Sequence, residues 1–260
     1  MLIRPMTGSL WSLAVLFLSA FLGGAVNAIA GGGTLLTFPS LLAFVGPIAA
    51  SATSTMALLP GSLAAGLGYR SELAQCRRML LILLPPSLVG GIIGSFLVIR
   101  IPERVFATLV PWLLVLASVL LLLQRPLQRY LGSRPHETPK GSTLWAVVFF
   151  QLLVGIYGGY FGAGIGILML SSLAFVGIPN IHQMNAVKSI LAAAMNGVSV
   201  VIFAAAGVVH WKYAFWMAIA ASLGGYAGAR VGRRLRPDYV RVIVVVIGFG
   251  VAAYSWISQN

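Results

Sequence analysis

The chain has 260 residues, of which 59% are hydrophobic and 8% are charged, and its mean hydropathy is +0.97. A water-soluble protein of this size cannot bury so much apolar surface, so the composition excludes a soluble globular fold and indicates a polytopic membrane protein. The formal net charge is +13, and the cationic residues lie between apolar segments. They are therefore a signal of membrane topology and do not indicate nucleic acid as a partner.

Segments of roughly 20 apolar residues, the length that crosses a hydrocarbon core of about 30 Å, recur along the chain. Two further apolar pieces, 34–46 and 165–177, are too short to cross in a straight line. We therefore expect an all-α, polytopic transmembrane helical bundle in the lipid bilayer, with interrupted or half-length helices. In chain order, the predicted spans cover residues 8–30, 49–69, 79–99, 103–123, 143–161, 182–206, 211–229 and 239–258.

Positively charged residues gather in three segments between the predicted spans. Because cytoplasmic loops are enriched in lysine and arginine, we expect these segments in the cytoplasm and both chain termini on the other side. The three groups are Arg70, Arg77 and Arg78; Arg125, Arg129, Arg134 and Lys140; and Arg230, Arg233, Arg234, Arg236 and Arg241.

The chain repeats itself. The heptapeptide SLLAFVG at 40–46 returns as SSLAFVG at 171–177, and the same shift of 131 residues places Gly31 on Gly162. We therefore predict a first transmembrane repeat over 1–123 and a second over 143–260, joined by a polar cytoplasmic linker over 124–142. The positive charge changes place between the two halves, which is what an inverted topology predicts, because equivalent loops then face opposite sides.

Each half carries a glycine cluster that is expected to interrupt a helix, because glycine costs about 1 kcal/mol relative to alanine in a helix interior. Where a new helix starts, its first backbone N–H groups have no partner within the helix and favour an anion. In the first half we expect Thr34 to cap the new helix. The alternative is that the glycines only allow close helix packing. The candidate substrate-binding residues here are Gly31, Gly32, Gly33, Thr34, Gly162 and Gly164.

Lys188 is the one ionisable residue well inside a predicted span, whereas the four acids, Glu72, Glu103, Glu137 and Asp238, fall between spans. The lack of an intramembrane carboxylate disfavours a cation carrier. An ammonium at the bilayer centre costs about 2.5–3.5 kcal/mol, so Lys188 needs a partner, either backbone carbonyls or the substrate anion. The alternative is that its side chain extends to the membrane surface.

Further polar candidates follow from helical spacing. Asn185 and Asn196 lie on the same face of the predicted helix as Lys188. The counterpart of this helix in the first half, residues 51–66, supplies hydroxyl groups, although hydroxyls in transmembrane helices most often bond to their own backbone. The hydroxyl candidates are Thr53, Ser54 and Thr55.

Enzyme chemistry and metal binding find little support. The chain has one cysteine, Cys76, and three scattered histidines, and neither an HExxH nor a GxSxG motif occurs. We expect no catalytic residues, no metal and no cofactor. His182 and His210 could couple proton movement to transport, or could simply lie at the membrane surface.

Several segments together resemble the sulfite exporter TauE/SafE family of membrane transporters, over about Leu10 to Ala253. They include AGGGTLLTFPSLLAFVGP, GIYGGYFGAGIGILML, NAVKSILAAAMNGVSVVIFAAAGVVHWKYA and LGGYAGARVGRRL. The resemblance implies a carrier of a small anion, such as sulfite, a sulfonate or thiosulfate, acting by alternating access in the bacterial plasma (inner) membrane. It does not identify the anion. An anion channel using the same site is the alternative, and a homodimer is a candidate assembly.

Overall fold

The computed structural model describes residues 10–29, 31–132, 141–175, 178, 180–231 and 237–259. All regular elements among these residues are α-helices, which confirms the expected all-α fold, and no strand occurs among them. The helices are α1 (Leu10–Ile29), α2 (Thr34–Leu42), α3 (Pro47–Gly68), α4 (Arg70–Gln75), α5 (Arg77–Arg100), α6 (Glu103–Gly132), α7 (Gly141–Tyr160), α8 (Ile165–Phe175), α9 (Ile181–Ala205), α10 (Trp211–Val231) and α11 (Pro237–Gln259).

Each predicted span coincides with a helix. Among the described residues, five segments are long and apolar enough to cross a membrane, namely Leu10–Ile29, Pro47–Gly68, Arg77–Arg100, Glu103–Leu123 and Ile181–Ala205. Shorter apolar segments lie at Leu144–Tyr160, Ile165–Ala174 and Val244–Ile257. Because α6 continues to Gly132, the linker predicted over 124–142 begins as helix, and residues 133–140 lie outside the described part of the chain.

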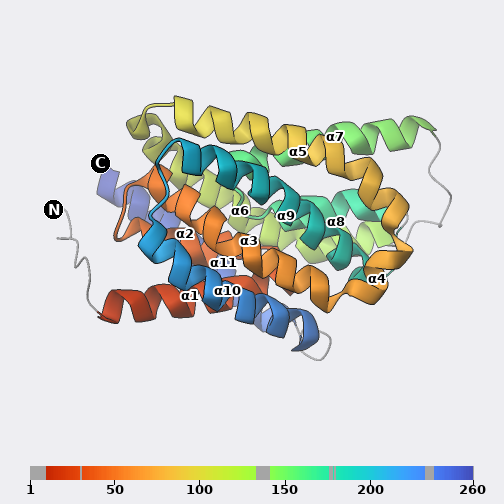
Figure 1. Ribbon diagram of the computed structural model, residues 1–260, viewed down its shortest axis with the longest axis horizontal. Helices are drawn as coiled ribbons and strands as arrows, with labels where there is room; N and C mark the ends of the chain where they lie inside the picture. The colour runs from red at the N-terminus through yellow and green to blue at the C-terminus, as the bar shows by residue number, and fades with distance from the viewer. Residues whose placement is uncertain are drawn as a thin grey trace.

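α1 and α2 form a hairpin. The Ser40 hydroxyl of α2 donates to the Ser19 hydroxyl of α1 over 2.8 Å, and one turn deeper Thr37 lies against Gly23. The short apolar piece after the first glycine cluster therefore turns back along α1. α1 begins at one end of the molecule and stops near the middle of its long axis (Figure 1).

α7 and α8 form a second hairpin of the same kind. The Ser172 hydroxyl of α8 donates to the Gln151 Oε1 of α7 over 3.4 Å, and Gly158 lies against Ile165 nearer the turn. α7 begins at the opposite end of the molecule from α1 and also stops near the middle (Figure 1). The two hairpins thus enter from opposite ends.

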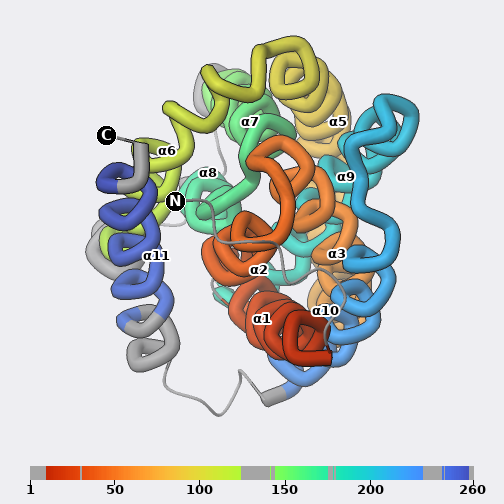
Figure 2. Tube along the Cα trace, turned by 90° about the vertical axis from the view of Figure 1, so that its left-hand side faces the viewer, coloured from red at the N-terminus to blue at the C-terminus, as the bar shows by residue number. Residues whose placement is uncertain are grey.

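The remaining helices hold the hairpins through reciprocal contacts. α1 packs against α10, and α7 packs against α5, while α3 lies beside α9 and α6 beside α11 (Figure 2). At the first contact Gly24 faces the Ala221 backbone, and at the second Gly155 faces the Gly90 backbone. These glycines lie 131 residues apart, so equivalent positions make equivalent close approaches.

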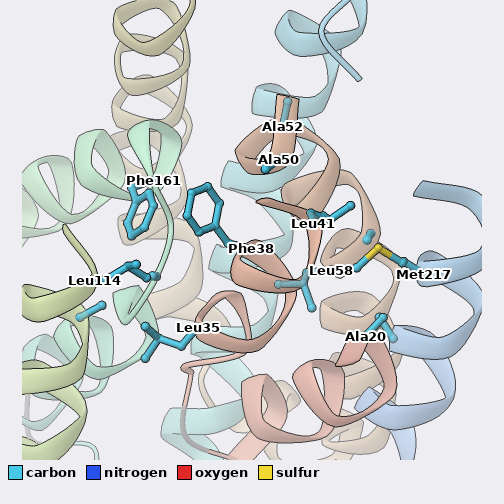
Figure 3. Packing of buried hydrophobic residues seen from close by; sticks show 14 of the residues in the cluster. Ala20, Leu35, Phe38, Leu41, Ala50, Ala52, Leu58, Leu114, Phe161 and Met217 are labelled. Carbon is cyan, nitrogen blue, oxygen red and sulfur yellow. The ribbon is translucent and has the colours of Figure 1, made fainter. Parts of the chain in front are cut away.

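Apolar side chains from both hairpins meet in the core. Phe38 of α2 and Phe161, just after α7, face each other edge to face with ring centroids 5.1 Å apart (Figure 3). Phe106 at the start of α6 packs against Phe161 in turn, at 6.4 Å. All three rings are essentially fully buried, so this cluster fixes the depth of both hairpins.

The arginine-rich segments share one half of the molecule. α4 and the start of α5, which carry Arg70 and Arg77, lie there, and α10 ends there at Arg230 and Val231 (Figure 1). α1 begins and α11 ends in the other half (Figure 1). Of the predicted positive positions, Arg134, Lys140, Arg233, Arg234 and Arg236 lie outside the described residues.

Candidate functional site

The first helix break lies between Ile29 and Thr34. Gly31 has φ +82°, a conformation that favours glycine, and its N–H donates to the Val26 carbonyl over 3.1 Å. Gly33 is the N-cap of α2 and has no side-chain cap. The expectation that Thr34 caps α2 is wrong, because the chain is already helical at Thr34 and its side chain therefore lies on the first turn.

The second break, between Tyr160 and Ile165, repeats the first. The Gly162 N–H donates to the Tyr157 carbonyl over 3.2 Å, and Gly162 has φ +78°. These donors and acceptors stand 131 residues after their counterparts. Gly164 also has a positive φ, +77°, and the Tyr157 hydroxyl donates to the Ala163 carbonyl over 2.8 Å, which holds the loop in place.

The two breaks touch. A Cβ atom placed on Gly31 would overlap the backbone of Gly166, and a Cβ on Gly166 would overlap Gly31. On the other side of this contact, a Cβ on Gly162 would lie 3.9 Å from the Thr34 hydroxyl oxygen. α6 lies behind both breaks, where Leu121 is next to Gly32. The helices α2 and α8 therefore begin beside each other.

Backbone N–H groups at these two helix starts lack acceptors. Within the part of the chain that the structure describes, which omits Ala30, no hydrogen bond is found for the amides of Gly32, Gly33, Thr34, Ala163, Gly164, Ile165 and Gly166. The Thr34 hydroxyl, on a side chain only 8% exposed, likewise has no partner among these residues. Buried donors without acceptors are costly, so this contact presents positive partial charge that an anion would satisfy.

The packing interpretation of the glycines also holds for part of the cluster. A Cβ on Gly33 would overlap the carbonyl oxygen of Gly23 in α1, so Gly33 allows the hairpin to close. A Cβ on Gly32 would lie 3.4 Å from Leu121, which is an ordinary contact. Close packing therefore explains Gly33 and the contact of Gly31, but it does not explain Gly32.

Lys188 lies in α9 and is 2% exposed, so it does not extend to the membrane surface. Its Nζ donates to the carbonyls of Asn27 and Ala28 over 3.0 and 3.1 Å and to the Asn185 Oδ1 over 2.9 Å. The sequence suggested backbone carbonyls or the substrate anion as partners of this ammonium, and in the structure it bonds two backbone carbonyls. The Cδ atom of Lys188 lies beside Gly166 at the contact between the breaks, while its Nζ lies at the end of α1.

Asn196 lies two turns further along α9. Its side chain is 8% exposed, and it has no hydrogen-bond partner among the described residues. Its counterpart in the first half, 131 residues earlier, is Ala65. Asn196 is therefore a nearly buried amide that no described protein group satisfies.

The predicted hydroxyls of α3 have protein partners. The Thr53 hydroxyl accepts from the His210 N–H over 3.0 Å, and the Ser54 hydroxyl shares a 2.6 Å hydrogen bond with the Thr37 hydroxyl of α2. The Thr55 hydroxyl donates to the Ser51 carbonyl of its own helix over 2.9 Å. Thr53 and Ser54 thus link α3 to neighbouring segments, and all three hydroxyls are bonded to protein groups.

Sequence reasoning did not single out Asn27 and Tyr157. Asn27 offers its carbonyl to Lys188 and donates its amide to the Ser62 hydroxyl of α3 over 3.1 Å. A lone amide in the apolar run before three glycines was a usable signal for Asn27. The Tyr157 hydroxyl has no such signal, because tyrosine is common in membrane helices.

No group of three metal-ligating side chains occurs in the described ranges. A cavity of about 410 Å³ lies where α3 and α6 begin, lined among others by Glu103, His210 and Trp211. None of the predicted site residues lines this cavity. It is therefore separate from the contact between the breaks.

Comparison with known sequences gives one consistent result. The family model described as "Sulfite exporter TauE/SafE" matches residues 16–255. The chain is similar to a probable membrane transporter protein of Haemophilus influenzae, with 29% identity over 95% of this chain and 96% of that protein. It is also similar to the probable membrane transporter proteins YfcA of Escherichia coli K12, with 29% identity over 90% and 86%, and YunE of Bacillus subtilis, with 25% identity over 91% and 96%. No solved structure matches.

Proposed function

We propose, from the premise that this chain belongs to the sulfite exporter TauE/SafE family of membrane transporters, that it carries a small anion across the bacterial inner membrane. Membership of this family makes the protein a transporter and not an enzyme. The proposed substrate class is sulfite or an organosulfur anion such as a sulfonate or thiosulfate. The proposed mechanism is alternating access.

Carriers that work by alternating access are commonly built from an inverted pair of repeats. We assign such repeats to residues 1–123 and 143–260, joined by the cytoplasmic linker 124–142; their helices interlock, α1 with α10 and α5 with α7, so the parts that move combine helices of both repeats. The hairpins that enter from opposite ends support this assignment, as do the equivalent hydrogen bonds of Gly31 and Gly162. With the arginine-rich half in the cytoplasm, both termini lie outside.

The proposed binding site is the contact between the two breaks. The observation that carries the proposal is that the starts of α2 and α8 meet there with amides that have no acceptor among the described residues. Such amides can replace the hydration that an oxyanion loses on entering the membrane. Gly31, Gly32, Gly33 and Thr34 supply one wall, and Gly162 and Gly164 supply the other.

α9 completes the proposed site. Lys188 contributes positive charge from the end of α1 without bonding the anion itself, because its own three N–H donors are already used, and Asn185 fixes its position. Asn196 offers an amide that no described residue bonds. We also include the hydroxyls of Thr53, Ser54 and Thr55 of α3 as ligands of the anion. To bind it, they would have to exchange their present hydrogen bonds for bonds to the anion as the protein changes conformation.

The substitution Thr34→Val tests the site, because it removes a hydroxyl without changing the shape of the side chain. A hydrogen bond to a charged group is worth about 1.5–3 kcal/mol, so the affinity for sulfite should fall roughly 10- to 100-fold. Saturation of sulfite flux into proteoliposomes measures this change. The melting temperature should stay the same, since no described protein group bonds this hydroxyl.

Thr37→Val is the matched control on the same helix. Its hydroxyl bonds the Ser54 hydroxyl and, over 3.3 Å, the Gly33 carbonyl, so this variant should lose stability, and its affinity should change less than that of Thr34→Val because Thr37 is not itself a proposed ligand. Equal sulfite affinity in wild type and Thr34→Val would refute the assignment. A screen over sulfite, thiosulfate, sulfate, taurine, sulfoacetate and carboxylates would then identify the anion or reject the substrate class.

The alternative is an anion channel through the same residues. The backbone contact between Gly31 and Gly166 favours a carrier, because it leaves no room for an ion to pass without movement of the hairpins. Slow, saturable flux that exchanges one anion for another indicates a carrier, whereas a large single-channel current would indicate a pore.

A further inference from the structure

The end of α1 carries two carbonyls that its own helix does not satisfy. In an α-helix the Asn27 carbonyl would accept from the N–H of Gly31, but this N–H bonds the Val26 carbonyl. The Ala28 carbonyl would accept from Gly32, whose N–H makes no such bond. Such carbonyls at a helix C-terminus concentrate negative partial charge, and they need a donor or a cation in the absence of water.

Lys188 meets this requirement from another helix. All three acceptors of its ammonium are amide oxygens, those of Asn27, Ala28 and Asn185, at 2.9 to 3.1 Å. In transporters with interrupted helices, carbonyls at such half-helix ends coordinate the coupling cation. The Lys188 ammonium therefore lies in the kind of oxygen environment that a dehydrated Na⁺ would occupy.

At the equivalent helix end, that of α7, the repeat places an alanine where Lys188 serves the end of α1. Lys188 corresponds to Ala57 of α3, and Ala28 corresponds to Gly159 of α7, by the same shift of 131 residues. The Gly159 carbonyl lies 3.5 Å from the neutral Ser95 hydroxyl, whose shorter contacts, at 2.7 Å, are with the Gly91 carbonyl and the Ser199 hydroxyl. One break thus has a lysine side chain bonded to its carbonyls, and the other has a neutral hydroxyl group nearby.

We propose that the Lys188 ammonium is a tethered cation that takes, at the end of α1, the place of a dissolved coupling cation, so that the protein moves its anion without Na⁺. This inference rests on the proposed anion transport. The protein then balances the charge of the bound anion with its own side chain, and the ion that drives transport need not be Na⁺.

The first experiment uses the wild-type protein in proteoliposomes. Sulfite flux with Na⁺ as the main cation is compared with flux when N-methylglucamine replaces all Na⁺ on both sides. The expected result is the same rate in both conditions. A rate that collapses without Na⁺ and recovers in a saturable way when Na⁺ returns would overturn the proposal.

The second experiment removes the ammonium from its cage of three amide oxygens, those of Asn27, Ala28 and Asn185. Lys188→Ala should lower the melting temperature of the purified protein, and millimolar Na⁺ or methylammonium should restore it in a saturable way, because Asn27, Ala28 and Asn185 remain. Lys212→Ala, the same change at an exposed lysine of α10, should neither lower the melting temperature nor respond to these cations. A Lys188→Ala melting temperature that responds to cations no more than the control does would overturn the proposal.

A second variant covers the case in which Lys188→Ala fails to insert. Asn185→Ala keeps the ammonium and removes one acceptor, so its melting temperature should fall without recovery in Na⁺ or methylammonium. Recovery in these cations would contradict a cage already filled by lysine. If no anion is transported by the wild type, the proposed function fails, and the melting experiments still decide whether Lys188 is a resident cation.

Discussion

The two helix breaks share a backbone conformation but differ in their side-chain chemistry. Gly31 and Gly162 have nearly the same φ, +82° and +78°, and each donates to a carbonyl five residues earlier. The Lys188 ammonium bonds carbonyls at the end of α1, whereas the neutral Tyr157 hydroxyl bonds the Ala163 carbonyl at the second break. The two helix starts thus share a backbone geometry, while the position equivalent to Lys188 in the repeat is Ala57.

The helices beside the breaks show the same difference. α9 carries Asn185, Lys188 and Asn196, where α3 carries Ser54, Ala57 and Ala65. At the proposed site, backbone amides would come from both halves, whereas the charged and amide side chains would come from the second half alone. The comparison indicates that the second half supplies the charge and the polar side chains.

The substitution Gly31→Ala tests the shared backbone conformation and should have the largest effect on stability. The new Cβ would overlap the Gly166 backbone, and the alanine would have to adopt a positive φ. The free energy of unfolding should therefore fall by roughly 2–5 kcal/mol. Equilibrium unfolding in mixed micelles measures this change.

Gly32→Ala is the control for this variant. Its Cβ would make an ordinary contact with Leu121 at 3.4 Å, so its free energy of unfolding should change by less than about 1 kcal/mol. Equal destabilisation by the two substitutions would show that the contact between the breaks does not constrain the fold.

Tyr157→Phe tests the neutral stabilisation of the second break. The Ala163 carbonyl would lose its 2.8 Å hydrogen bond, and an unsatisfied buried carbonyl costs about 1–3 kcal/mol. Tyr254→Phe, at a side chain 61% exposed, should change the free energy of unfolding by less than about 0.5 kcal/mol. The free energy of unfolding is again measured in mixed micelles. A loss for Tyr157→Phe no larger than that for Tyr254→Phe would show that this hydroxyl does not stabilise the loop.

Asn196→Ala should have the smallest effect on stability, within about 0.5 kcal/mol, because no described group bonds this amide. Its affinity for sulfite should nevertheless fall about tenfold, as expected for the loss of one hydrogen bond to an anion. Asn185→Ala, by contrast, should lose about 1–3 kcal/mol of stability, because Asn185 accepts from Lys188. Unfolding and flux saturation are measured on both variants, and a strongly destabilised Asn196→Ala with unchanged affinity would contradict a substrate role.

Local composition was sufficient to predict where the helices stop. Three successive glycines at Gly31 to Gly33 and the cluster from Gly162 weaken any helix, and the structure interrupts the chain at both positions. The expected capping by Thr34 was wrong because hairpin closure against Gly23 sets the start of α2 one residue earlier. The exact start of a helix depends on such contacts, which propensity does not contain.

The sequence by itself determined the membrane environment, the helical fold, the internal repeat and the family, because hydropathy, spacing and motif identity are local properties of the chain. Only the tertiary structure decided that the short apolar segments return as hairpins and that Lys188 bonds Asn27 and Ala28, which lie 161 and 160 residues away. It also decided that the hydroxyls of α3 bond other protein groups. A hydrogen-bond partner depends on which helices pack together, and that packing is settled by the fit of small residues across the whole bundle.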